Sequence, residues 1–96
     1  MVCVIQKPSF DIGRALITPG ANIALEESGE SPLKFLYMHK SGDWGILGDD
    51  DKALNDEALE SGGRILSAYL TEKGAKLYII TEADRSATTI MLAEEY

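Results

Sequence analysis

Three short β-prone runs in the last third of the chain limit the possible folds more than any other feature. "RILSAYLT" at 64–71 is followed by a turn with Gly74 and by "KLYIIT" at 76–81, and "EADRS" then leads into "ATTIML" at 87–92. Connections this short join antiparallel neighbours, so strands at 64–70, 76–81 and 87–92 are predicted to form a meander. The nearly unbroken apolar run at 76–81 predicts the central strand, which pairs on both sides.

Three helices are predicted before this meander. Two of them begin with a capping side chain followed by proline, Thr18 before Pro19 and Ser31 before Pro32, and a glycine ends each. The third, at about 50–61, begins among aspartates, which favour the positive end of the helix dipole, and ends at a Gly-Gly pair. Helical spacing predicts these inward positions: Ala21, Ala24, Leu25 and Ser28 in the first helix, Leu33, Leu36 and Tyr37 in the second, and Leu54 and Ala58 in the third.

A further strand is predicted within "FDIGRALIT" at 10–18, although Gly13 weakens the pattern and the partner strand cannot be deduced. The 96 residues suit a single domain, 1–96, in which 1–11 are expected to be a flexible or added N-terminal segment. The predicted fold class is α+β, with an antiparallel sheet of three or four strands and about three helices packed on one face.

The sequence carries no pattern of export or membrane insertion. The sole cysteine, Cys3, cannot form an intramolecular disulfide, and "MVCVIQKP" lacks the basic start and long apolar stretch of a signal peptide. No apolar run approaches the roughly 20 residues that span a bilayer. A cytoplasmic protein without a membrane partner is therefore predicted.

Negative charge is concentrated in one segment. The chain has a net charge of −7, and "DDDKALNDEALE" at 49–60 holds six acids and one lysine. Direct binding to nucleic acid is not expected, because it depends on clustered Lys and Arg that neutralise phosphates. The segment is either a solvated helix face that keeps the protein soluble or a surface for a basic or nucleic-acid-binding protein. The candidate acidic face consists of Asp49, Asp50, Asp51, Asp56, Glu57 and Glu60.

Polar and aromatic side chains also gather in the predicted loops. The candidate cluster consists of His39, Asp43, Trp44, Arg64, Asp84 and Arg85. In a functional interpretation His39 is a general base or proton donor, Arg85 binds an anion or acts in catalysis, and Trp44 is an exposed anchor. In a structural interpretation His39 pairs with the helix dipole or a carboxylate, Arg85 is a clamp toward Asp43 or the third helix, and Trp44 caps the core.

Recognised cofactor and metal patterns are missing from the sequence. One histidine and a distant cysteine do not make a zinc site, and in 49–60 Leu54 stands where a calcium loop requires glycine. "GDWGILG" and "SGG" lack the spacing of phosphate and dinucleotide loops. We therefore expect no metal and no cofactor, and no residue is assigned a catalytic role.

Four blocks in the order "HKSGDWG", "NDEALESGGRILSAY", "YIITEADRSATTIML" and "EEY" resemble a family of short uncharacterised proteins encoded on bacterial plasmids and other integrated mobile elements. Some members carry an automatic restriction-system label without a nuclease or methylase motif. The resemblance covers about 17–96, and this chain departs from the family at Ile46, where an acid is common, and at Ala93, where proline is common. The matching positions are His39, Gly42, Asp43, Trp44, Gly45, Asn55, Arg64, Tyr69, Thr81, Glu82, Asp84, Arg85 and Thr89. The resemblance implies a mobile-DNA setting and no particular activity.

Two hypotheses for function follow. The first is a small acidic protein-binding module of a mobile element, which masks a host defence or regulatory protein with the third helix and Trp44. The second is a small enzyme or ligand-binding domain that uses His39, Asp43, Asp84 and Arg85. Convergence of these four side chains in one open pocket would favour the second, and their burial in satisfied pairs would favour the first. The oligomeric state is left open, with a homodimer as one alternative.

Overall fold

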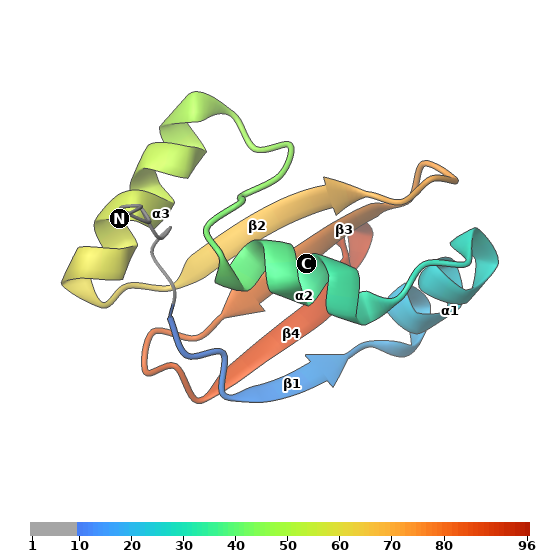
Figure 1. Ribbon diagram of the computed structural model, residues 1–96, viewed down its shortest axis with the longest axis horizontal. Helices are drawn as coiled ribbons and strands as arrows, with labels where there is room; N and C mark the ends of the chain where they lie inside the picture. Colours follow the sequence, from blue (N-terminus) through green and yellow to red (C-terminus); the bar gives the residue numbers. More distant parts are fainter. Residues whose placement is uncertain (1–9) are drawn as a thin grey trace, which may run out of the picture.

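The structure is a computed structural model, and it describes residues 10–96 (Figure 1). The segment expected at 1–11 therefore lies outside the described residues except for its last two positions. The elements in chain order are β1 (Arg14–Ile17), α1 (Pro19–Ser28), α2 (Pro32–Lys40), α3 (Asp49–Ser61), β2 (Ile65–Leu70), β3 (Lys76–Thr81), β4 (Ala87–Leu92) and the 3₁₀ turn η1 (Ala93–Glu95). This is an α+β fold, as predicted.

The four strands form one sheet in the order β1-β4-β3-β2. β3 pairs antiparallel with β2 on one side and with β4 on the other, which confirms the predicted meander and its central strand. The expectation of a purely antiparallel sheet was wrong, because β1 runs parallel to β4, with Arg14 opposite Ala87. Short turns impose antiparallel pairing, whereas the long connection between β1 and β4 permits the parallel direction.

The helix boundaries follow the predicted caps. The Thr18 hydroxyl accepts a hydrogen bond from the Ala21 amide and begins α1, and the Ser31 hydroxyl accepts one from the Leu33 amide and begins α2. Gly29 ends α1 in the left-handed conformation with a φ of 70°. These bonds satisfy backbone groups that a helix end would otherwise leave unpaired.

α1 and α2 cover one face of the sheet (Figure 1). The larger core between them contains Ala21, Leu25, Phe35, Tyr69, Leu77, Ile79 and Ile90. The predicted inward face of α2 was wrong at two positions, because Leu33 is 71% exposed and Tyr37 is 75% exposed. Phe35 instead packs on the ring of Tyr69, with ring centroids 5.4 Å apart, and His39 is fully buried. Contacts with the sheet, rather than the number of apolar residues on each side, set the rotation of α2.

α3 lies beside the outer edge of β2 (Figure 1). A second, smaller core joins it to the sheet through Trp44, Ala58 and Ile65. The prediction that Leu54 is buried was wrong, since it is 61% exposed and Asn55 takes the inward position. The reason lies in the edge strand, whose outward backbone groups need partners. Asn55 Nδ2 donates to the Leu66 carbonyl at 2.6 Å and Asn55 Oδ1 accepts from the Leu66 amide at 3.1 Å, which a leucine cannot do.

Candidate functional site

His39 is part of a chain of hydrogen bonds inside the core. Its Nδ1 pairs with the Ser67 hydroxyl, and its Nε2 lies 2.8 Å from Thr81 Oγ1. Thr81 Oγ1 lies 2.7 Å from Thr88 Oγ1, and the Thr88 hydroxyl donates to the Ile12 carbonyl at 2.7 Å. The chain therefore links α2 to three strands and to the segment before β1.

The carbonyl at the end of this chain fixes the direction of every bond in it. The Thr88 hydroxyl has one proton, which it donates to the Ile12 carbonyl. In the bond between the two threonines, Thr81 must therefore be the donor. The Thr81 oxygen then accepts a hydrogen bond from His39 Nε2. His39 is then the neutral tautomer with the proton on Nε2, and its Nδ1 accepts from Ser67. Both ring nitrogens are satisfied, which leaves neither free to exchange a proton with a substrate.

Burial lowers the pKa of His39 to about 4 from its ordinary value of 6.5. The expected pairing of this histidine with a carboxylate or the helix dipole was wrong, because its partners are neutral hydroxyls. The side chain is therefore a structural part of the core at neutral pH.

The free energy of unfolding is predicted to fall as the pH is lowered from about 6.5 to about 4. The unfolded chain takes up a proton at His39 near pH 6.5, whereas the folded chain does so only near pH 4, so acid favours unfolding within this window by roughly 3 kcal/mol. Urea unfolding at several pH values measures this effect. Exposed carboxyls also respond to acid, so His39→Gln, which cannot titrate, is the control. Equal slopes for wild type and His39→Gln would refute this role for His39.

The two aspartates of the candidate cluster lie in separate turns. The Asp43 carboxylate accepts from the Gly45 amide at 3.1 Å, and the Asp43 carbonyl accepts from the Tyr69 hydroxyl at 2.5 Å. The Asp84 carboxylate accepts from the Ser86 amide at 3.0 Å, and its hydrogen bonds with Ser86 lower the pKa of Asp84. Each carboxylate stabilises its own loop.

Arg85 holds the end of α3 against the β3–β4 turn. Its guanidinium donates to the Gly63 carbonyl at 2.7 Å and to the Ala58 carbonyl at 3.2 Å, so it reaches the third helix, as the structural interpretation expects. Its own backbone is left-handed, with a φ of 63°.

Trp44 is buried, and its Nε1 donates to Asp56 Oδ1 at 3.1 Å. His39 and Arg85 both contact the Phe10 ring, at 5.2 Å and 5.8 Å from its centroid, whereas Asp43 and Asp84 each bond within their own turn. None of the four lines the groove described next.

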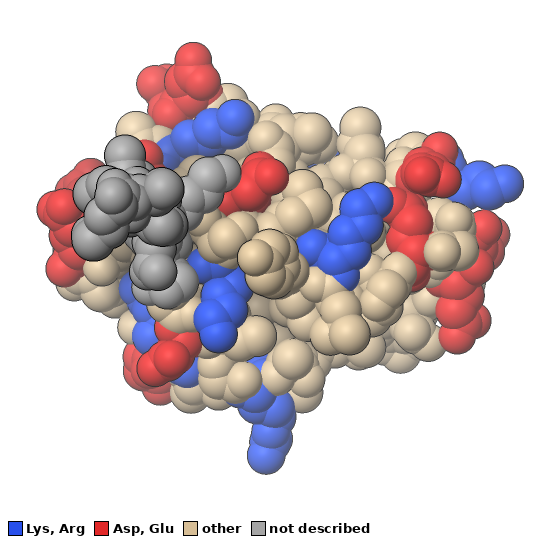
Figure 2. Space-filling view, in the orientation of Figure 1, with Lys and Arg blue, Asp and Glu red and all other residues tan. Residues whose placement is uncertain are grey.

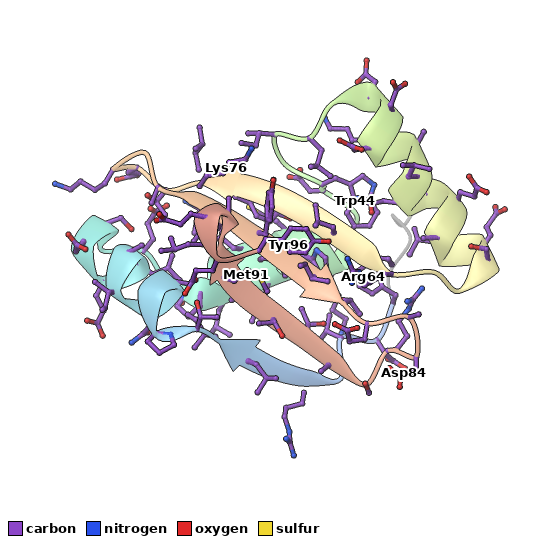
Figure 3. All side chains as sticks on the ribbon, turned by 180° about the vertical axis from the view of Figure 1, so that it is seen from behind. Trp44, Arg64, Lys76, Asp84, Met91 and Tyr96 are labelled. Carbon is purple, nitrogen blue, oxygen red and sulfur yellow. The ribbon has the colours of Figure 1, made fainter. Side chains whose placement is uncertain are left out.

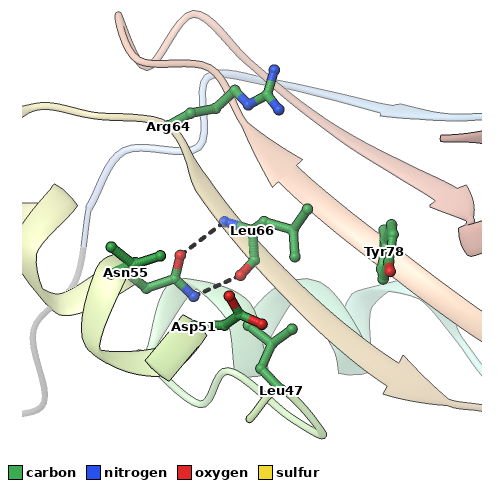
Figure 4. A pocket seen from close by; sticks show the side chains of 7 residues that line it. Leu47, Asp51, Asn55, Arg64, Leu66 and Tyr78 are labelled. Atoms are coloured by element: carbon green, nitrogen blue, oxygen red, sulfur yellow. Dashed lines mark hydrogen bonds between the residues drawn. The ribbon is translucent and has the colours of Figure 1, made fainter. Parts of the chain in front are cut away.

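A groove of about 280 Å³ lies elsewhere, between α3 and the sheet (Figure 4). Of the predicted cluster, only Arg64 contributes to it, and the acidic segment contributes Asp51. The apolar lining consists of Leu47, Leu54, Leu66 and Tyr78. Sequence reasoning missed the groove because it joins four separate segments, and because Leu54 was placed in the core.

Most of the acidic segment forms the solvent side of α3. All six candidate acids are exposed. At about 100° per residue, five of them fall within a sector of about 120° opposite Asn55, and Asp51 is turned to the groove. The five residues of this acidic face are Asp49, Asp50, Asp56, Glu57 and Glu60. Acidic side chains gather over α3 at the upper left of Figure 2.

Comparisons with known proteins leave the family open. No family model, curated protein or solved structure matches this chain. The resemblance to mobile-element proteins therefore stays a prediction. Within residues 10–96, no three His, Cys, Asp or Glu side chains are grouped so that they could hold a metal ion. None of the helices in this described part combines the length and apolar character that a membrane crossing requires.

Proposed function

We propose that this chain is a small acidic protein-binding module of a mobile genetic element, which acts in the host cytoplasm by masking a defence or regulatory protein. The observation that carries the proposal is the acidic face of α3, placed beside an open groove with an apolar lining. Charge gives long-range attraction to a basic partner, and apolar surface gives the contact its stability. An apolar groove bordered by charged side chains has the arrangement of a protein interface, in which an apolar centre is surrounded by a polar rim.

The side chains of the acidic face are exposed in the described part of the chain. The acidic face forms no ion pair within residues 10–96, where the recorded pair is Lys34 with Glu30 in another part of the molecule. Lys52 is the one cation of α3. The negative charge of the acidic face is therefore largely uncompensated by the rest of the described chain. A basic protein, including one that itself binds nucleic acid, is the partner that this charge favours.

The enzyme hypothesis lacks the geometry on which it depended. It required His39, Asp43, Asp84 and Arg85 to face one open pocket, and the four side chains instead make hydrogen bonds that hold the fold. All four have hydrogen-bond partners, although only His39 is buried and Asp84 is exposed, so they support the binding module by being engaged in the fold rather than by burial.

The proposal predicts that neutralising the acidic face abolishes partner capture. A variant with Asp49→Asn, Asp50→Asn, Glu57→Gln and Glu60→Gln should capture about tenfold less of a specific protein from a bacterial host lysate. Asp56 is kept, because it bonds to Trp44. The amount captured is measured by quantitative mass spectrometry, after circular dichroism has shown that the variant is folded.

The matched control removes four exposed acids elsewhere, with Glu27→Gln, Glu72→Gln, Glu82→Gln and Glu94→Gln. It has the same net charge as the test variant, so it separates a local surface from a general effect of charge. Capture should stay at the wild-type level. Equal capture by both variants, or no specific capture by wild type, would refute the proposal.

A further inference from the structure

The groove beside α3 offers an apolar floor that residues 10–96 leave partly exposed. Leu54 is 61% exposed, and Leu66 and Tyr78 are only half-buried. Leu66 and Tyr78 lie on the face of the sheet opposite α1 and α2, because they alternate along β2 and β3 with residues of the larger core. Tyr96, labelled in the view of this side in Figure 3, packs edge-on against Tyr78 with ring centroids 5.6 Å apart. Apolar surface that is already gathered in a hollow favours the burial of an apolar side chain from another molecule.

The shape of the groove is fixed before any partner arrives. The two hydrogen bonds between Asn55 and the Leu66 backbone hold α3 at a set distance from β2. Arg85 holds the other end of the helix through the Ala58 carbonyl. A preformed groove loses less conformational entropy on binding than one that must first be ordered.

Opposite charges stand at the two sides of this floor. Figure 4 shows Arg64 on one side of Leu66 and Asp51 on the other. The Arg64 guanidinium donates to the Tyr96 hydroxyl at 2.5 Å and meets no carboxylate within residues 10–96, and Asp51 meets no cation there. Each charge can therefore pair with an opposite charge on an incoming molecule.

We propose that the groove binds an extended segment of the partner protein in which one apolar side chain lies between a basic and an acidic residue. The basic residue pairs with Asp51, the acidic residue pairs with Arg64, and the apolar side chain enters between Leu54 and Tyr78. The volume of about 280 Å³ has room for one apolar side chain of a longer segment. This inference rests on the proposed protein-binding function.

The probe is the capped peptide acetyl-Lys-Gly-Leu-Gly-Glu-amide. In an extended chain its three side chains point to one side at intervals of about 7 Å. Titrated into ¹⁵N-labelled protein, it should cause saturable shifts in the NMR signals of Leu47, Leu54, Leu66 and Tyr78. Replacing the peptide leucine by glycine should weaken binding about tenfold. Leu54→Ser should do the same, whereas Leu33→Ser, which alters another exposed leucine on α2, should not.

The roles of Asp51 and Arg64 are tested by replacing each with a residue of opposite charge. Asp51→Lys should make the protein prefer acetyl-Glu-Gly-Leu-Gly-Glu-amide over the original peptide by up to about fivefold, the scale of one exposed ion pair. Asp50→Lys changes the same charge one residue away on the acidic face, and it should leave the preference unchanged. Arg64→Glu should favour the peptide with lysine at both ends, and Lys73→Glu should not.

Three results would overturn the inference: no saturable shifts with any peptide, equal changes for Asp51→Lys and Asp50→Lys, or free leucine that binds as tightly as the peptide. The last result would indicate a small-molecule site. Failure here is distinguishable from failure of the proposed function. Lysate capture that depends on the acidic face, without peptide binding, would refute only the groove chemistry, and peptide binding without lysate capture would refute only the masking role.

Discussion

Replacing Trp44 by alanine is expected to lower the free energy of unfolding by about 3 to 5 kcal/mol, the usual cost of removing a large buried aromatic side chain. Trp44 is 4% exposed and forms the smaller core with Ala58 and Ile65. This core attaches α3 to the sheet, so the cavity would open where the acidic helix is held. Much of the stability of so small a domain would be lost.

Urea unfolding followed by circular dichroism measures the effect of Trp44→Ala. Asp56→Ala is the control, because it removes only the partner of the Trp44 indole N–H and should cost about 1 kcal/mol. Unchanged unfolding midpoints for Trp44→Ala would show that the ring contributes little to folding, and would restore it as a candidate interface anchor.

Replacing Gly45 by alanine is expected to destabilise the protein by about 2 to 5 kcal/mol. Its backbone is left-handed, with a φ of 74°, which costs a residue with a side chain about 1 to 2 kcal/mol. A methyl group here would also meet the Ala68 carbonyl oxygen at 1.9 Å, and overpacking of this kind adds about 1 to 3 kcal/mol. The Trp44 carbonyl and the Ile46 amide both form hydrogen bonds with the backbone of Ala68 in β2. The clash would push the loop away from β2 and weaken these two bonds.

Gly29→Ala separates the two contributions to this cost. Gly29 has a φ of 70°, and an added methyl group would meet no atom within 4 Å, so only the backbone preference is lost. The temperature of half-unfolding should fall clearly further for Gly45→Ala than for Gly29→Ala. Equal losses would mean that the loop moves away from β2 at little cost.

These contacts give the segment "HKSGDWG" at 39–45 a structural role. His39 is fully buried and Trp44 belongs to the smaller core, Asp43 orders the turn, and Gly45 allows the chain to reach the edge of β2. The segment joins α2, β2 and α3, and a change in it should act through folding. The surface proposed for function lies farther along the chain, on α3 and the adjoining groove.

Local signals in the sequence predicted the local structure. Thr18 and Ser31 with their following prolines mark two helices, and the short turns around Gly74 and Asp84 determine the order of the last three strands. Each signal acts within a few residues, where capping and turn chemistry decide the backbone. Such signals need no knowledge of the rest of the fold.

Tertiary contacts decided what the sequence could not predict. The parallel pairing of β1 with β4 joins segments with no short turn between them. The rotation of α2 depends on partners for Phe35 and His39 in the sheet, and the inward position of Asn55 depends on the unpaired edge of β2. The groove followed from these outcomes, because burying Asn55 turns Leu54 outward.

Photo-crosslinking from position 54 tests the central claim, that the α3 side of the molecule binds a partner protein. A photoreactive amino acid in place of Leu54, irradiated in a bacterial host lysate, is predicted to give a specific covalent adduct, which neutralisation of the acidic face abolishes. The same amino acid in place of Leu33, another exposed helical leucine, is predicted to give none. Adducts at neither position, or equal adducts at both, would contradict the account.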